Sequence, residues 1–482
     1  MKKYLMRGGM SPLDVYTPDQ VHATNSIGAN SGNLLYAFGV YRTLMTEDVQ
    51  IDMDYYGVER SYTDADIDRI NEEYDAYICP LADAFRDEFR GKLLKYAHFF
   101  DRLTIPCYVI GMGIRAKYGQ NLKDYDYTMD EEAKIFLKAL LNKSAMVGLR
   151  GEITGGYLKH LGFVEEKDFR VIGCPSMYMY GRDLHQRSDF KFDENGLLLP
   201  ETKLSFNMSS KTPANIISFL ASQMDRFEDY YCVEQNENEM ALLYYGLDYN
   251  PRQDVNRDFF PTTVNHPLIQ QDRYKMFINV RTWNEFMKGR DLSVGSKLHG
   301  NVAALISGCP ALFLPLDGRM QELINYHKFA SVPYEEVKEN DTIESLLERV
   351  DITAVAKQQA ENFDRYVDFL NINGLDHIYK EDLNRTVAPV DLIMDQRDYP
   401  VPDSILHVDN AEAIRRFNSA YYKAKKEVGK FKGQANRAKK ELAESQKIQR
   451  TLEKENERLK RELERANSIS GFLKNNLKKY KK

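Results

Sequence analysis

Short apolar runs alternate with amphipathic stretches from residue 1 to about residue 345. Such runs predict buried strands, and apolar residues that recur every three or four positions predict helices packed on them. The strands are expected at residues 74–80, 105–111, 145–150, 169–175, 203–207, 229–235, 292–295 and 311–316, and helices at 33–44, 130–142, 153–161, 216–227 and 302–307. This alternation predicts an α/β fold with parallel sheets covered by helices on both faces.

The polar stretch 180–200 interrupts this alternation, and a new strand begins at Lys203. We therefore expect two α/β domains with the active site in the cleft between them. The apolar stripe of residues 344–370 predicts helices that complete the second domain, and three prolines between 384 and 404 indicate a linker. The predicted organisation is a first domain at residues 1–200, a second at 201–383, a linker at 384–408 and a basic helical tail at 409–482.

The tail contains no proline and repeats its seam residues every seven positions. One row is Leu442, Gln449, Asn456 and Leu463, and the offset row is Ser445, Leu452, Leu459 and Ala466. These rows correspond to the a and d positions of a coiled coil, and an asparagine at an a position favours a two-stranded register. We predict a homodimer through this helix, with a single solvated helix and a disordered basic tail as the alternatives.

Charge is distributed unevenly along the chain. The 482 residues carry a net charge of −6, but the segment from Tyr421 to Lys482 has 20 basic and 8 acidic residues, which leaves a body near −18 and a tail near +12. An acidic body argues against nucleic-acid binding, whereas a basic tail suits a partner chain or an anionic lipid surface. Two interpretations of the end of the tail stay open, a simple solvated end and peripheral contact with a membrane.

The five cysteines are far apart, mostly in apolar runs, and form no C-x-x-C pair. This pattern favours buried free thiols in a reducing compartment and predicts neither disulfides nor a zinc site. No run of about 18 apolar residues occurs. The expected location is the cytoplasm, with membrane association only at the surface.

The segment 293–316 carries the clearest chemistry, because it forms a strand, turn, helix, turn and strand. Lys297 and His299 follow the strand and precede a helix expected to start near Asn301. Ligands of α/β sheets bind at such strand ends, and the free N–H groups of a helix start attract anions. Since histidine exchanges protons near neutral pH, His299 is the first candidate for catalysis, the alternative being a turn residue bonded to backbone.

The motif K-L-H-G-N at 297–301, followed by A-A-L-I-S-G-C-P-A-L-F-L, resembles the R-L-H-x-x-x-x-A-L-x-x-G-x-P signature of polysaccharide pyruvyl transferases. Similar blocks lie in the family's order over roughly residues 20 to 330. They are N-S-G-N at 30–33, Y-D-A-Y-I-C-P at 74–80, Y-V-I-G-M-G-I at 108–114, V-G-L-R-G-E at 147–152, Y-L-K-H-L-G at 157–162 and V-I-G-C-P-S at 171–176.

The resemblance implies two Rossmann-like domains of the GT-B type and transfer of the enolpyruvyl-derived group of phosphoenolpyruvate to two hydroxyls of a sugar, giving a pyruvate ketal. The acceptor would be a saccharide on a lipid- or nucleotide-linked precursor of a cell-surface or exported polysaccharide. Phosphoenolpyruvate would be the donor substrate, with no further cofactor. Because the Asp and Glu residues show no pair with ligand spacing, we also expect no metal. His299 matches the family's histidine and would act as general acid and later as base.

The remaining site residues follow from the motif and from strand ends. Lys297 replaces the family's usual arginine, which keeps the charge without the planar fork. The segment 30–33 admits two readings, helix capping by Asn30 or Ser31 and contact with the acceptor or a phosphate. The full set of predicted substrate-binding residues is Lys297, Leu298, Asn301, Arg150, Arg115, Arg319, Asn30, Asn33 and Asn207.

Two alternatives remain open at this point. A glycosyltransferase of the same architecture would use a nucleotide sugar, because fold does not determine chemistry. A non-catalytic scaffold would keep the fold and assemble through the tail, and the replacement of arginine by Lys297 is the observation that favours it.

Overall fold

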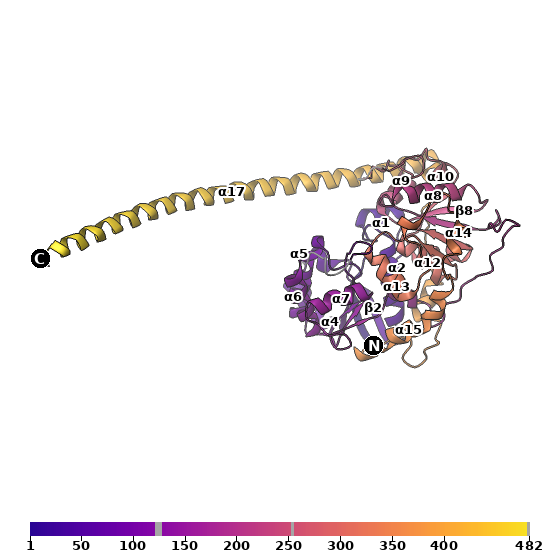
Figure 1. Cartoon of the computed structure of the whole chain (residues 1–482), viewed down its shortest axis with the longest axis horizontal. Helices are drawn as coiled ribbons and strands as arrows, with labels where there is room; N and C mark the ends of the chain where they lie inside the picture. Colours follow the sequence, from indigo (N-terminus) through magenta and orange to yellow (C-terminus); the bar gives the residue numbers. More distant parts are fainter. Residues whose placement is uncertain (121–127, 252–254, 480–482) are drawn as a thin grey trace. The chain divides into compact units, whose positions relative to one another are not determined.

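The computed structural model describes residues 1–120, 128–251 and 255–479, and side chains as far as residue 465. It divides into two units, Met1–Arg416 and Phe417–Lys482. Ala466 of the predicted seam lies outside the described side chains. Figure 1 shows the elements in order along the chain.

The first half of the large unit contains a parallel sheet in the order β2-β1-β3-β4, continued by the parallel pair β5-β6 through a bridge between Met112 and Leu149. Its strands are β1 (Lys2–Met6), β2 (Val49–Met53), β3 (Ala76–Pro80), β4 (Cys107–Ile110), β5 (Val147–Leu149) and β6 (Phe169–Val171). The second half contains a parallel five-stranded sheet in the order β11-β10-β7-β8-β9. Its strands are β7 (Leu204–Asn207), β8 (Tyr230–Glu234), β9 (Tyr274–Met276), β10 (Leu292–Gly295) and β11 (Ala311–Phe313).

Helices connect these strands throughout. In the first half they are α1 (Pro18–Thr24), α2 (Gly32–Leu44), α3 (Gly57–Arg60), α4 (Asp64–Glu73), α5 (Arg90–Arg102), α6 (Asp130–Leu141) and α7 (Glu152–His160). In the second they are α8 (Ala214–Met224), α9 (Glu237–Tyr245), α10 (Pro267–Gln270), α11 (Val280–Lys288), α12 (Leu298–Ile306), α13 (Gly318–His327) and α14 (Ile343–Leu347). The C-terminal helices are α15 (Ala354–Ile372), α16 (Pro389–Met394) and α17 (Asn410–Lys479). The predicted α/β class with two Rossmann-like halves and a long C-terminal helix is confirmed.

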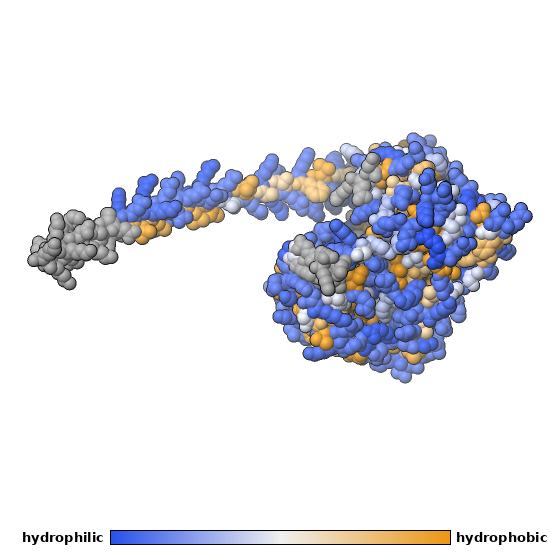
Figure 2. All heavy atoms as spheres, in the orientation of Figure 1, coloured by the Kyte–Doolittle hydropathy of each residue, from blue (hydrophilic) through white to orange (hydrophobic). Residues whose placement is uncertain are grey.

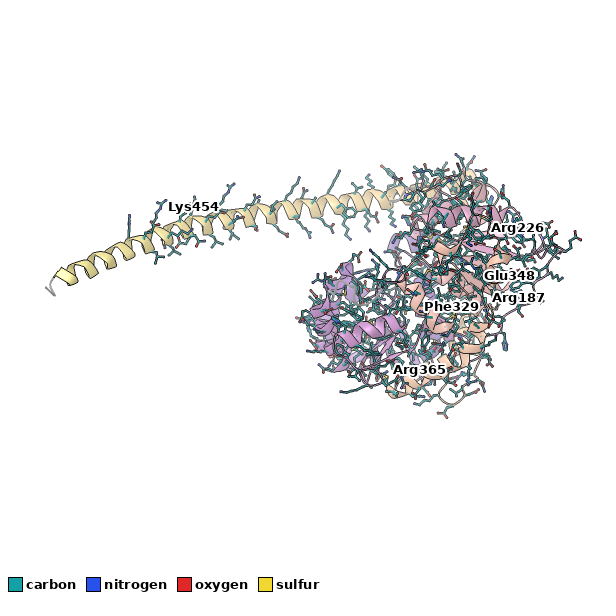
Figure 3. The ribbon with its side chains drawn as sticks, in the orientation of Figure 1. Arg187, Arg226, Phe329, Glu348, Arg365 and Lys454 are labelled. Atoms are coloured by element: carbon teal, nitrogen blue, oxygen red, sulfur yellow. The ribbon has the colours of Figure 1, made fainter. Side chains whose placement is uncertain are left out.

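The two helices expected to complete the second domain contact different halves. Glu344 of α14 pairs with Arg226 at 2.7 Å in the second half. In contrast, Arg365 of α15, which Figure 3 labels, donates to the backbone oxygen of Val171 at 2.8 Å in the first half. Figure 1 shows α15 beside α13, which in turn lies against α7. The chain therefore returns to the first half after α14. This return connects the two halves more closely than in a protein whose two domains simply follow one another along the chain.

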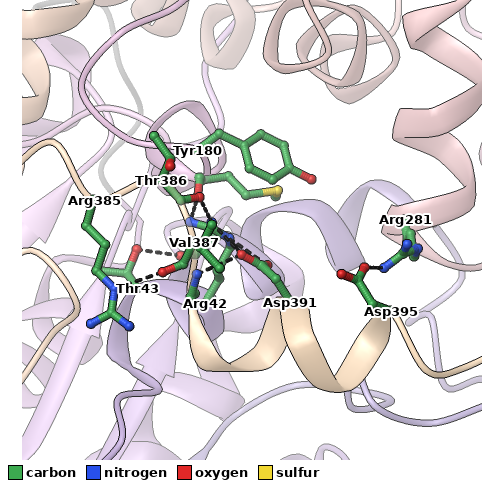
Figure 4. A network of polar contacts seen from close by, with 12 residues as sticks. Arg42, Thr43, Tyr180, Arg281, Arg385, Thr386, Val387, Asp391 and Asp395 are labelled. Carbon is green, nitrogen blue, oxygen red and sulfur yellow. Dashed lines mark hydrogen bonds and ion pairs between the residues drawn. The ribbon is translucent and has the colours of Figure 1, made fainter.

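The segment 384–408, expected to be a linker, is packed on the large unit. Asp391 of α16 accepts hydrogen bonds from the fully buried guanidinium of Arg42, which also donates to the oxygen of Thr386 at 2.6 Å. Arg281 of α11 pairs with Asp395 nearby (Figure 4). Pro389 occupies the first position of α16, where a proline is tolerated. The ion pairs with Arg42 and Arg281 therefore anchor this segment to both halves.

Candidate functional site

His299 lies where the two halves meet. Helix α12 begins at Leu298, three residues earlier than the expected start at Asn301, so His299 is inside its first turn. A Cβ atom on Gly32 of α2 would lie 2.7 Å from Nδ1 of His299, and this close approach requires glycine. The side chain of Leu298 is half-buried and packs against the apolar core, and its predicted contact with substrate stays a prediction. The ring of Tyr36 lies 6.1 Å from the imidazole, centroid to centroid.

Residues beside His299 join the halves directly. Ser31 donates its backbone N–H to the oxygen of Gln235 at 2.8 Å, and Nδ2 of Asn30 donates to Oδ1 of Asn236 at 2.7 Å. Ser31 makes no capping bond at the start of α2. The capping interpretation is therefore wrong for its hydroxyl but confirmed for Asn30, whose Oδ1 accepts the N–H of Gly32, the first residue of α2, at 2.8 Å. The amide of Asn30 is engaged in holding the halves together next to His299.

Asn33, also predicted to bind substrate, fixes the loop before α2. Its Nδ2 donates to the backbone oxygens of Ile27 at 3.0 Å and Gly28 at 3.1 Å. These bonds hold the approach to α2 in one conformation. Asn33 therefore holds the loop that precedes α2 at the junction of the two halves.

Asn207 and Asn301 brace the turn between β10 and α12. Nδ2 of Asn207 donates to Oδ1 of Asn301 at 2.7 Å, and Oδ1 of Asn207 accepts from the N–H of Lys297 at 2.7 Å. Nδ2 of Asn301 donates to the oxygen of Gly295 at 3.0 Å. Both amides are buried and occupied. The two asparagines therefore position His299.

The ammonium of Lys297 is enclosed by two carboxylates. It bonds to Glu234 and, at 2.7 Å, to Oε2 of Glu239, and both carboxylates are completely buried. Burial raises the pKa of Glu234, and the neighbouring Glu239 adds to the rise. Burial acts to raise the pKa of Glu239 as well, but Lys297 outweighs it and the pKa is lowered. Burial acts to lower the pKa of Lys297, yet the two carboxylates raise it.

The ammonium of Lys297 is therefore already paired within the chain, and its predicted contact with the donor stays a prediction. Its charge is used inside the second half, where an unpaired ammonium or carboxylate would be strongly unfavourable. The sequence motif identified the charge but not its partners, because β8 and α9 supply them from about 60 residues away in the chain.

Arg115 and Arg319 converge on one carboxylate. Oδ2 of Asp83 lies 2.9 Å from Nη2 of Arg115 and 3.3 Å from Nη1 of both Arg319 and Arg86. Burial acts to raise the pKa of Asp83, but these three arginines lower it. Arg319 also pairs with Asp317 at 2.6 Å. The first loop after β3 thus gathers predicted cations from distant segments.

Arg150 is buried beside this cluster, and its Nε has no hydrogen-bond partner among the described residues. Glu322 of α13 is also buried and accepts hydrogen bonds from the N–H and hydroxyl of Thr154 at 3.0 and 2.9 Å. Burial raises the pKa of Glu322 to about 7, although the charge of Arg150 acts to lower it. Sequence analysis missed Glu322, which lies in an ordinary amphipathic helix.

The pKa of His299 is lowered to about 3, first by burial and then by the positive charges of Arg150 and Arg319. The imidazole is therefore neutral at pH 7 in the protein without ligand. Two predicted cations, Arg150 and Arg319, act electrostatically on the predicted catalytic group. Their combination with His299 defines an environment that attracts anions.

Several buried polar atoms of His299 and of the segments described above have no partner among the described residues. They are Ser31 Oγ, Asp83 Oδ1, Arg150 Nε, Gln235 Nε2 and His299 Nε2. A Cβ on Gly300 would lie 2.8 Å from Nε2 of Gln235, which places that amide beside the histidine turn. An unpaired buried polar group costs about 1–3 kcal/mol, so a group of them indicates a place for a polar ligand.

Within the described ranges, no group of three or more His, Cys, Asp or Glu side chains could hold a metal ion. Ser31, Asp83 and Gln235 were not among the predicted site residues. Gln235 ends a predicted strand, a position that could have identified it, since strand ends meet at one edge of a parallel sheet.

The fold and the site define a two-part α/β protein with a half-buried histidine in an arginine-rich junction. The chain belongs to the polysaccharide pyruvyl transferase family, whose model matches residues 30–318. No curated protein sequence matches the chain.

Solved structures with a similar arrangement have little sequence in common with it. A UDP-GlcNAc 2-epimerase from Neisseria meningitidis bound to UDP-GlcNAc is 9% identical, with a TM-score of 0.39 over 77% of this chain and 100% of that chain. The Methanocaldococcus jannaschii UDP-GlcNAc 2-epimerase in complex with UDP-GlcNAc and UDP is 12% identical, with a TM-score of 0.34 over 77% and 99%. A glycosyltransferase from Streptomyces nogalater is 8% identical, with a TM-score of 0.31 over 77% and 96%.

Proposed function

We propose that the protein transfers the enolpyruvyl-derived group of phosphoenolpyruvate to a saccharide and forms a pyruvate ketal, with His299 as general acid and base. Family membership supports a pyruvyl transferase. The observation that carries the finer proposal is the unpartnered Nε2 of His299 in the field of Arg150 and Arg319. The donor brings a phosphate and a carboxylate, and both suit guanidinium groups.

In the proposed reaction, protonation of the donor's methylene carbon gives a methyl group and an oxocarbenium-like centre at the adjacent carbon. A sugar hydroxyl attacks this centre and phosphate leaves. The second hydroxyl then closes the ring. Of the two hydroxyl protons, one replaces the proton given to the methyl group and the other leaves with phosphate. Nε2 of His299 would hold the transferred proton between these steps.

The low pKa of His299 adds one requirement to this scheme. A neutral imidazole has no proton to give to carbon, so His299 must be protonated when the donor is bound. The negative charges of phosphoenolpyruvate would offset Arg150 and Arg319, the two cations that lower the pKa. Donor binding therefore creates the acid that the next step needs.

The first test is thermal stabilisation of the full chain by phosphoenolpyruvate and, separately, by UDP-sugars. A ligand at 100 times its dissociation constant stabilises the folded state by about 2.7 kcal/mol. We expect phosphoenolpyruvate to stabilise the parent and the control Arg69→Gln, whose side chain forms an exposed pair with Glu73, but not Arg150→Gln.

The second test is acceptor-dependent release of phosphate, which His299→Gln should abolish while donor binding remains. Stabilisation by UDP-sugars alone would replace this proposal by a nucleotide-sugar glycosyltransferase. Stabilisation by neither ligand, together with normal cellular function of His299→Gln, would favour the scaffold alternative.

The proposed acceptor is a saccharide on a lipid- or nucleotide-linked precursor, and the proposed location is the cytoplasm. All five cysteines are buried free thiols, which suits a reducing compartment. Among the described helices, none has the length and apolar character needed to cross a bilayer. Peripheral contact of the basic tail with anionic lipid stays a prediction.

A further inference from the structure

We propose that α17 pairs with the same helix of a second copy, parallel and in register, along a seam from Phe417 to Leu463. The seam follows alternating steps of four and three residues over seven heptads. It is therefore longer than the two rows of four residues described under the sequence analysis. Its 14 positions are Phe417, Tyr421, Ala424, Val428, Phe431, Ala435, Ala438, Leu442, Ser445, Gln449, Leu452, Asn456, Leu459 and Leu463. The seam begins at the first residue of the second unit.

The large apolar side chains of this seam are uncovered in the single chain. Leu442, Leu452 and Leu463 are each about 60% exposed, at 60%, 59% and 63%, and Phe431 is 66% exposed. Figure 2 shows hydrophobic patches on this helix among hydrophilic residues. A helix with an exposed apolar stripe of period 3.5 is stabilised by burying that stripe against another helix.

The glycines of the tail avoid the seam. Gly429 and Gly433 occupy b and f positions, which face away from a partner, and a Cβ on either would meet no atom within 4 Å. Each glycine weakens an isolated helix by about 1 kcal/mol relative to alanine. A continuous helix through both positions therefore depends on contacts along its other face, which the second copy supplies.

The charges beside the seam distinguish parallel from antiparallel pairing. In a parallel dimer each g residue faces the e residue five positions further along in the partner. This pairs Glu427 with Lys432 and Glu455 with Lys460, once on each side of the dimer. Antiparallel pairing would instead bring g residues against g residues and e residues against e residues. Those positions are rich in like charges, so the parallel arrangement is favoured.

The polar seam residues fit the same arrangement. Asn456 occupies an a position, where two asparagines of an in-register dimer hydrogen-bond to each other. Leucines at the d positions 452 and 459 flank it and suit two strands. The occupant that fits both the charges and this register is a second copy of the chain.

The test is disulfide cross-linking in the full chain, since the native cysteines are buried. Ala424→Cys lies at a d position near one end of the seam, so parallel in-register pairing places it beside its own copy. An antiparallel pair would place it near the opposite end. Lys426→Cys, two residues away at an outward f position, is the matched control.

We expect a dimeric mass by light scattering and rapid oxidation of Ala424→Cys, but not of Lys426→Cys, to a covalent dimer. Glu455→Lys should weaken dimerisation about tenfold, and Glu455→Lys/Lys460→Glu should restore it, because the exchange recreates the attractive pairs. A monomeric or trimeric mass would overturn the proposal. A dimer that cross-links neither cysteine would overturn the parallel register, and mass increase only with anionic vesicles would assign the helix to lipid.

Discussion

Replacing Lys297 by methionine should lower the free energy of unfolding by about 3–5 kcal/mol, the cost of removing one partner from a buried ion pair. The magnitude follows from the surroundings of its ammonium, since the carboxylates of Glu234 and Glu239 are both completely buried. Methionine keeps most of the volume and removes the ammonium, with its charge and its hydrogen bonds to both carboxylates. The two carboxylates would then face each other without a cation.

The pH dependence gives this prediction a sign. In the parent, the lowered pKa of Glu239 stabilises the fold above the unfolded pKa, and this contribution is lost as pH falls through the folded pKa. Without Lys297, burial would raise the pKa of Glu239, so the variant would lose stability as pH rises. The difference in free energy of unfolding between the parent and Lys297→Met should therefore increase from about pH 4 to pH 8.

Urea unfolding followed by tryptophan fluorescence measures this difference, because Trp283 is the single tryptophan and is buried in the same half. Lys297→Met/Glu234→Gln/Glu239→Gln should recover much of the loss. Lys288→Met, from an exposed pair with Glu285, is the control and should cost less than about 1 kcal/mol. The reasoning is refuted if Lys297→Met is as stable as this control but no longer binds phosphoenolpyruvate.

Three further predictions concern the junction and the C-terminal segment. Gly32→Ala should displace the imidazole of His299 and lower kcat for phosphate release about 100-fold, because a misplaced catalytic group loses alignment. Gly91→Ala is the control, since a Cβ at Gly91 would meet open space. Unchanged activity of Gly32→Ala would contradict the position of His299. Arg42→Met should destabilise the fold by about 3–5 kcal/mol and expose residues 384–408 to proteases, since it leaves Asp391 without its buried partner. If this segment stays resistant to proteolysis in the variant, other contacts anchor it. Donor binding at pH 7 should be accompanied by uptake of about one proton, because the pKa of His299 is about 3 in the protein without ligand. Calorimetry in buffers of different ionisation enthalpy measures this uptake. If no proton is taken up, His299 is not the acid.

Hydrophobic periodicity predicted most of the central strands, because a strand buried on both faces is an unbroken apolar run. It missed β1, which lies inside its sheet but begins with two lysines, and β2, whose V-Q-I-D-M alternates apolar and polar residues at the edge of that sheet. It also missed β9, which is three residues long. Short and edge strands carry few apolar residues, so sequence alone separates them poorly from loops.

The site was partly predictable for a topological reason. Parallel strands bring their carboxyl ends to one edge, so residues after separate strands converge even when they are far apart in sequence. This placed Arg150, Arg319 and His299 in one environment. Burial and pairing were not predictable, because Asp83 and Glu322 act through tertiary contacts that no local pattern records.

The position of Lys297 bears on whether the chain retained catalysis. The family's arginine at this point suggested a donor ligand, and its loss favoured a scaffold. The ammonium of Lys297 is instead neutralised by Glu234 and Glu239. The lysine of this chain supplies a single positive charge to this carboxylate pair, as an arginine at the same position would. The cations that act on His299 are Arg150 and Arg319. The substitution therefore no longer counts against an enzyme, and the unpartnered atoms around His299 remain features that a scaffold would have no reason to keep.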